Sequence, residues 1–227
     1  MKKNKFLVEF SWVIFFILVM VFFKVCFFGF YVVPSQSMEP NLEPGDRIFA
    51  NKLAYGLRIP FLPTSLLQWS FPKRGDIILF SYENEDEIYI KRVLGVPGDL
   101  ISFREGVVLI NGAPLNLIKL EQKPSWDEGL TTYEEANPSF FQSPHAILLS
   151  TMPTKTFFES RRFLVPPGKL FVLGDNRDHS ADSRVYGYVD AKRVYGKAHF
   201  ILFSTTGISL WPHFRNGRVM KSLNPSS

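Results

Sequence analysis

The sequence has little charge and a single cysteine. Charged residues make up 21% of its 227 residues, whereas 46% are hydrophobic and 23 are Phe. Such a composition excludes an intrinsically disordered chain, which is apolar-poor and charge-rich. One cysteine excludes an intrachain disulfide and a cysteine-based zinc site. A Gly-rich phosphate loop and a His-Glu-x-x-His motif are also missing from the sequence, so we expect no metal and no cofactor.

Neither sign of charge dominates strongly. Lys and Arg number 26 against 21 Asp and Glu, which gives a net charge of +5. This excess is small and spread along the chain, so it is weak evidence for a nucleic-acid partner, and we expect none. The length fits one domain with an elaboration, and we expect a monomer.

One long hydrophobic run lies near the N-terminus. Residues 10–23 carry no charge, and the run extends back to Phe6 if Glu9 is accepted near its boundary. At about 1.5 Å per residue, a helix over 6–23 is roughly 27 Å long, close to the thickness of the hydrocarbon core. Lys24 follows the run and would reach the far interface. The sequence therefore predicts a transmembrane anchor over 6–24.

A cleavable signal peptide is the alternative, with a basic start, a short apolar centre and small residues at its end. Here the apolar stretch is longer, and Phe and Val stand where small residues should be, which favours a retained anchor. The positive-inside rule then places residues 1–5 in the cytoplasm and residues 25–227 on the other side of the membrane. Later segments lack the length and hydropathy to return, so a single pass is expected.

The rest of the chain reads as short strands punctuated by Gly and Pro, which predicts a mainly β domain with antiparallel sheets. A hairpin closed at Glu105-Gly106 is expected, with a second turn at Asn111-Gly112. Strands are predicted over residues 76–82, 88–94, 100–104, 107–110, 169–173 and 197–203.

Two stretches differ from this pattern. Residues 113–166 contain six prolines among mixed polarity, which predicts an inserted, loop-rich subdomain. Residues 53–71 are rich in Leu and aromatic side chains. This second stretch fits either the core or the membrane interface, where Trp and Tyr concentrate, and the sequence does not decide between them.

Two serines and one strand carry the first candidate functional groups. Ser35 and Ser37 lie between two prolines just beyond the apolar run, where a polar turn is the simplest interpretation. The strand over 88–94 carries one cation on each face, because strand alternation separates Lys91 from Arg92. Lys91 faces solvent in the simplest interpretation; in the other, an apolar site holds it and favours loss of its proton.

A third candidate is the polar stretch over residues 174–184, directly after an apolar strand. A surface turn needs Gly, Asp and Asn, but not two Arg, three Asp and two Ser together. A Ca²⁺ loop is a poor fit, because the carboxylates miss the alternating ligand positions and a closing Glu.

Read together, these stretches resemble the bacterial type I signal peptidases, membrane-bound serine proteases with a Ser–Lys dyad. Two departures from the family pattern are visible: Asn41 stands where Thr is usual, and His179 where Asn is common. The matching segments, in order along the chain, are 34–47, 74–77, 89–99, 174–184 and the ending Leu210-Trp-Pro-His-Phe-Arg.

The resemblance implies a function and a set of site residues. Such a protein removes signal peptides from exported preproteins at the inner membrane, cutting after a small-x-small pattern. The resemblance makes Ser37 the nucleophile and Lys91 the general base, which must be neutral to act. Further roles follow from the same resemblance: Ser35 and the Ser37 N–H for the oxyanion, Ser180 to hydrogen-bond Lys91, Asp182 and Arg184 as a supporting pair, Arg92 and Asp175 in the surrounding network, and Val33, Tyr89 and Ile90 in the small-residue pockets.

Other classes compete with this interpretation. A Ser–His–Asp hydrolase would use His179, which sits amid Asp residues, but the nucleophile-elbow motif is absent around Ser37. A membrane-tethered binding module would explain the anchor and the β domain without any catalysis. A self-cleaving repressor also uses Ser and Lys, but it would carry a DNA-binding region instead of an anchor.

Overall fold

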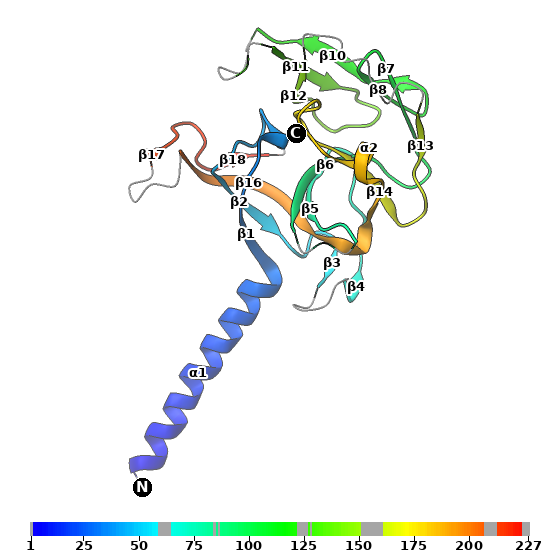
Figure 1. Cartoon of the computed structure of the whole chain (residues 1–227). Coiled ribbons are helices and arrows are strands. Elements are labelled where there is room, and N and C mark those ends of the chain that lie inside the picture. The colour runs from blue at the N-terminus through cyan, green and yellow to red at the C-terminus, as the bar shows by residue number, and fades with distance from the viewer. Residues whose placement is uncertain are drawn as a thin grey trace.

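A computed structural model describes residues 2–58, 65–83, 85, 87–121, 127, 129–150, 161–206 and 213–223. Its first element is a 26-residue helix, α1 (Lys2–Phe27), which extends away from a β domain (Figure 1). Within the described residues, no helix combines the length and the hydropathy that crossing a bilayer requires. The chain passes directly from α1 into the first strand, β1 (Phe28–Val32).

A nine-stranded sheet forms the centre of the domain. Its strands run in the order β1-β2-β16-β5-β6-β14-β15, and β17 and β18 pair with β16 as well. All these pairings are antiparallel, as the sequence predicted. The bounds are β2 (Asp46–Asn51), β5 (Ile77–Phe80), β6 (Tyr89–Gly95), β14 (Lys169–Leu173), β15 (Val189–Asp190), β16 (Val194–Thr206), β17 (His213–Phe214) and β18 (Lys221–Ser222).

A four-stranded sheet, in the order β13-β7-β8-β9, packs beside the central one. The predicted hairpin is present: β7 (Leu100–Arg104) pairs with β8 (Val107–Ile110). Glu105 and Gly106 turn the chain with φ of 52° and 78°, the positive values that a two-residue hairpin loop demands. The two remaining strands are β9 (Ala113–Pro114) and β13 (Arg162–Leu164).

The predicted loop-rich insertion over 113–166 is more ordered than the sequence indicated. Its described residues form a three-stranded antiparallel sheet of β10 (Asn116–Lys119), β11 (Leu130–Ala136) and β12 (His145–Ser150). Pro138 and Pro144 lie between strands, so they end strands without interrupting them. Residues 122–126, 128 and 151–160 of this region lie outside the described residues.

The described part of the stretch over 53–71 is partly buried and partly exposed. Tyr55 is buried, and Phe71 packs against the same apolar cluster. The short hairpin of β3 (Gly56–Leu57) and β4 (Leu67–Gln68) instead exposes Leu67 and Trp69 by 58% and 57%. Residues 59–64 of the stretch lie outside the described residues.

Apolar clusters enclose β6, the strand that carries the two predicted cations. Ile90 belongs to one buried cluster, Val93 to a second and Leu94 to a third. Burying each such side chain stabilises the fold by about 1.5–3 kcal/mol. Side chains on β6 are therefore held in a dry environment on both faces of the sheet. The short helices of the domain are η1 (Gln36–Met38), α2 (Ser183–Tyr186) and η2 (Ala191–Arg193).

Candidate active site

Ser37 lies in the middle of the single-turn helix η1, between β1 and β2. Met38 is 1% exposed and anchors the turn in the core. The Ser37 carbonyl accepts a hydrogen bond of 3.2 Å from the backbone N–H of Asn176, and the Asn176 side chain donates to the Gln36 carbonyl at 3.3 Å. The turn is thus fixed to the loop that follows β14, while the Ser37 hydroxyl stays partly accessible.

Lys91 reaches Ser37 from β6. Its Nζ donates to the Ser37 Oγ at 2.5 Å, although 54 residues separate the two in the chain. Lys91 is 4% exposed. Burial lowers the pKa of Lys91 to about 8, while Asp182 and Asp175 oppose that change more weakly. A substantial fraction of this amine is therefore neutral near pH 8, and a neutral amine can accept the proton of a serine hydroxyl.

Two further serines lie at the same place. The Ser35 Oγ is 3.2 Å from the Ser37 Oγ, and Ser35 is exposed. The Ser180 Oγ is buried without a hydrogen-bond partner among the described residues, so the expected bond from Ser180 to Lys91 is not formed. Ser180 packs instead against Gly174, where a Cβ would overlap both the Ser180 side chain and the Ser37 carbonyl.

The expected ion pair between Asp182 and Arg184 is formed, and Arg92 and Asp175 form a second one. The buried carboxylate of Asp182 receives the Arg184 guanidinium through Nε at 2.8 Å and through a second nitrogen at 2.9 Å. Asp182 also accepts from the Gly174 N–H at 3.1 Å and caps α2. These contacts hold the two ends of the 174–184 loop together.

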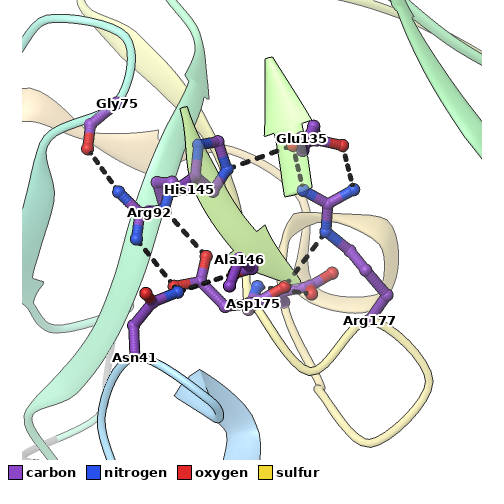
Figure 2. A network of polar contacts seen from close by, with 10 residues as sticks. Asn41, Gly75, Arg92, Glu135, His145, Ala146, Asp175 and Arg177 are labelled. Carbon is purple, nitrogen blue, oxygen red and sulfur yellow. Dashed lines mark hydrogen bonds and ion pairs between the residues drawn. The ribbon is translucent and has the colours of Figure 1, made fainter. Parts of the chain in front are cut away.

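The second pair joins Arg92 to Asp175, with distances of 2.8 and 2.7 Å. Arg92 also donates to the Gly75 carbonyl at 2.9 Å. Figure 2 shows this pair within a polar network that also includes Asn41, Glu135, His145 and Arg177. Arg92 is as buried as Lys91, at 4% exposure.

Residues without a role in the sequence analysis complete this network. The Asn41 side chain donates to Asp175 at 2.7 Å and to the Ala146 carbonyl at 2.6 Å. Glu135, fully buried on β11, receives Arg177 through two hydrogen bonds. The His145 Nε2 lies 3.1 Å from the same carboxylate, and burial together with Arg92 lowers the pKa of this histidine. For this network, the sequence offered one signal, the departure from the family pattern at position 41. Glu135 and its partners lie too far apart in the chain for a local sequence pattern to relate them.

The residues assigned to substrate pockets differ in their exposure. Val33 and Ile90 are buried in one apolar cluster, whereas Tyr89 is partly exposed and stacks on Phe80. The strand β6 lies inside the sheet, because β5 pairs with it on one side and β14 on the other. However, β14 pairs only from Arg92 to Gly95, which leaves the segment over 89–91 without a described neighbouring strand on that side.

The histidine of the competing hydrolase interpretation is not a partner of Ser37. His179 is exposed on its loop. The Ser37 hydroxyl contacts Lys91 and Ser35, and none of the histidines within the described ranges hydrogen-bonds it. Residues 210–212 of the predicted C-terminal match lie outside those ranges.

Comparison with known proteins points to one family. The family model described as "Signal peptidase, peptidase S26" matches residues 7–203. A signal peptidase I of Pseudomonas aeruginosa is 34% identical over 194 residues, which cover 80% of this chain and 65% of that protein. One of Rickettsia akari is 34% identical over 197 residues, covering 80% and 73%.

The chain spans about 65% of the length of the Pseudomonas aeruginosa relative. Among solved structures, a signal peptidase I from Enterococcus faecalis is 27% identical and covers 56% of this chain and 95% of its own. The TM-score of that superposition is 0.34, which is too low to bear on the fold.

Proposed function

Because the chain belongs to the signal peptidase family, peptidase S26, we propose that it is a membrane-bound serine endopeptidase. Its substrates are exported preproteins, from which it removes the N-terminal signal peptide. The observation that carries this proposal is the 2.5 Å hydrogen bond between the Lys91 Nζ and the Ser37 Oγ. A lysine that is 4% exposed and in contact with a hydroxyl is arranged as a general base.

In the proposed reaction, neutral Lys91 takes the proton of the Ser37 hydroxyl as its oxygen attacks the scissile carbonyl. Lys91 then gives this proton to the leaving amine, and an ester on Ser37 remains. Lys91, now neutral again, takes a proton from a water molecule, which attacks the ester. Lys91 then returns this proton to the Ser37 oxygen, which regenerates the enzyme. A lysine with its usual pKa of about 10.4 would be almost fully protonated at pH 8 and unable to start this cycle.

The oxyanion formed at each step needs hydrogen-bond donors. We assign the Ser37 backbone N–H and the Ser35 hydroxyl, and the 3.2 Å separation of the two serine oxygens supports the second assignment. Ser180 is assigned a supporting role beside Gly174, with Asp182–Arg184 holding its loop and Arg92–Asp175 holding the strand next to Lys91. A preorganised oxyanion donor, such as the Ser37 N–H or the Ser35 hydroxyl, typically contributes a factor of about 10²–10³ in rate.

The substrate would bind in extended form beside residues 89–91, where β14 has already ended. Its backbone would extend the sheet, and Val33, Tyr89 and Ile90 would line pockets for the small residues of the small-x-small pattern. Replacing the Ala just before the cut by Phe should block cleavage, because a large ring cannot enter a pocket sized for a methyl group.

We further propose that residues 6–24 anchor the protein in the bacterial inner membrane, with 1–5 in the cytoplasm and 25–227 on the extracytoplasmic side. The uncharged run over 10–23 and the basic start support this orientation. Phe10 and Trp12 expose 54% and 57% of their surface on α1, so lipid contact would cover them. A substrate whose apolar segment lies in the same bilayer then meets Ser37 close to the surface.

The test is cleavage of a secretory precursor by the detergent-solubilised full chain. Wild type should release the mature protein, whereas Ser37→Ala and Lys91→Ala should not. His179→Ala should cleave normally, because no hydrogen bond joins it to Ser37. Full activity in Lys91→Ala, or loss of activity in His179→Ala, would contradict the proposed dyad, and no cleavage by wild type would favour a binding module.

A further inference from the structure

The three-stranded sheet of β10, β11 and β12 contributes one partner of a buried ion pair, which Glu135 forms with Arg177. Glu135 is completely buried, and Arg177 is 3% exposed. The guanidinium and the carboxylate face each other through two hydrogen bonds, of which the first is 2.8 Å long. Burying an ion pair adds little to stability compared with apolar packing, so its value lies in fixing one arrangement of the two parts that it joins.

The two parts are the sheet and the loop that follows β14. Arg177 belongs to this loop, and its Nε donates to the Gly174 carbonyl at 3.2 Å. The backbone reinforces the same contact: Leu148 of β12 donates to the Asp175 carbonyl at 2.9 Å and accepts from the Arg177 N–H at 3.0 Å. A parallel bridge pairs Leu148 with Asn176. The loop is therefore joined to β12 by one isolated bridge beside the small sheet.

Asn41 connects this assembly to the nucleophile. It lies four positions after Ser37, and its amide group donates one hydrogen bond to the Ala146 carbonyl of β12 and one to Asp175. Asp175 in turn holds Arg92, the neighbour of Lys91 on β6. Figure 2 shows Asn41 and Arg92 reaching the Asp175 carboxylate from two separate elements, while Asn41 also contacts Ala146 of β12. A Thr at position 41 is too short to reach both acceptors.

We propose that Glu135 and Asn41 are positioning residues for the dyad, and that the three-stranded sheet sets the distance between Lys91 and Ser37 through them. Glu135 acts through Arg177 on the 174–178 backbone, which holds Ser37 by its carbonyl. Asn41 acts through Asp175 and Arg92 on β6. This inference rests on the proposed function, since it assigns a task to groups that do not touch the substrate.

Glu135→Gln and Asn41→Thr test the proposal, with Glu134→Gln as the matched control. Glu134 is the next residue on β11, and strand alternation points it to the other face. Both test variants should lower kcat about tenfold to a hundredfold with KM changed little, because a small displacement of reacting groups has effects of that size. Glu134→Gln should match wild type.

The pH profile of kcat/KM separates positioning from a merely structural role. A loosened site admits water to Lys91, so its acid limb should move to higher pH by about half a unit to one unit. The charged groups that act on Lys91 are Asp182, Asp175 and Arg184, and all three side chains are retained in both variants. Circular dichroism and thermal unfolding report whether each variant is folded.

Folded Glu135→Gln and Asn41→Thr with kcat values and pH profiles that superimpose on Glu134→Gln would overturn the proposal. If Glu135→Gln does not fold, Asn41→Thr decides alone, because Thr is compatible with the family pattern at this position. Failure of this inference is distinguishable from failure of the proposed function, because in the latter case wild type and Glu134→Gln would also show no cleavage that depends on Ser37.

Discussion

Two cations lie side by side on β6, on opposite faces of the sheet, and have different environments. Lys91 and Arg92 are both 4% exposed. Arg92 faces the Asp175 carboxylate, which it contacts through two hydrogen bonds, and the Gly75 carbonyl. Lys91 faces the Ser37 hydroxyl, and within the described part of the chain no carboxylate lies within hydrogen-bond distance of it. Equal burial thus leaves Arg92 paired as a structural charge and gives Lys91 a pKa of about 8.

The comparison shows that burial alone does not decide what a buried cation does. Burial removes hydration from the charged form, and a hydrogen-bonded carboxylate offsets that loss. On the Arg92 face the offset is present, and the paired guanidinium braces the strand. On the Lys91 face it is missing, so the proton is held weakly and the amine is available as a base.

The largest effect on catalysis is expected from Lys91→Arg, which gives position 91 the same side chain as position 92. Lys91→Arg keeps the positive charge and nearly the same length, but a guanidinium is not deprotonated in proteins. We therefore expect a loss of about 10⁴-fold or more in kcat/KM, equal to that of Ser37→Ala, because residues that act as a unit fail together. Precursor cleavage with both variants measures this. Partial activity in Lys91→Arg would mean that charge, not proton transfer, is what position 91 supplies.

The next effect comes from removing the carboxylate on the other face. Asp175→Asn leaves the Arg92 guanidinium buried without a counter-charge, which should lower the free energy of unfolding by about 3–5 kcal/mol. Denaturant titration followed by circular dichroism measures the loss. Glu83→Gln, on an exposed loop, should stay within about 0.5 kcal/mol of wild type. Equal stability of the two variants would remove the structural role assigned to the Arg92 pair.

A smaller effect is expected from the second serine on the Lys91 face. Ser35→Ala removes one proposed oxyanion donor and should lower kcat by about 10²–10³, with KM nearly unchanged. Ser139→Ala, at an exposed position on the loop between β11 and β12, serves as the control and should match wild type. If Ser35→Ala is as inactive as Ser37→Ala, the distinction between nucleophile and donor is wrong.

The smallest effect is expected from Lys91→Met, which should raise the stability of the protein, whereas Asp175→Asn should lower it. The pKa of Lys91 is about 8 in the folded protein and about 10.4 in the unfolded chain. Between these pH values the unfolded state binds more protons, so the stability of wild type rises with pH across this window. Lys91→Met should accordingly be more stable than wild type below pH 8, by up to about 3 kcal/mol, and the difference should shrink by pH 10.

Thermal unfolding of wild type and Lys91→Met at pH 7 and pH 10 measures that change. Lys192→Met, at an exposed position, is the control and should show no such pH-dependent difference. A stability difference between wild type and Lys91→Met that stays constant with pH would mean that Lys91 titrates as an ordinary lysine.

Local patterns predicted β5, β6, β14 and part of β16, four of the nine strands in the central sheet, but not β1, β2, β15, β17 or β18. The Glu105-Gly106 turn follows from two adjacent residues that suit positive φ, and β6 follows from its apolar run. The sequence motifs also marked the segments that bring Ser37, Lys91 and the 174–184 loop together.

Interactions between distant segments escaped the sequence analysis. Glu135 and Arg177 lie 42 positions apart, and Asn41 and Asp175 lie 134 apart, so no periodicity relates them. The strands β11 and β12 were not predicted, because the prolines around them suggested a loop-rich segment. A proline that lies between two strands is compatible with a loop-rich segment and with a sheet. The expected bond from Ser180 to Lys91 was wrong for a related reason: a motif fixes which residues meet, but side-chain rotamers decide which atoms bond.

The most direct measurement of the central claim is the titration of the Lys91 side chain itself. Nuclear magnetic resonance of protein labelled at lysine Cε follows each amine with pH, and the spectrum of Lys91→Arg identifies the resonance that belongs to residue 91. The account predicts a midpoint of about 8 for this resonance. A midpoint in the ordinary range, about 10.4, would contradict it.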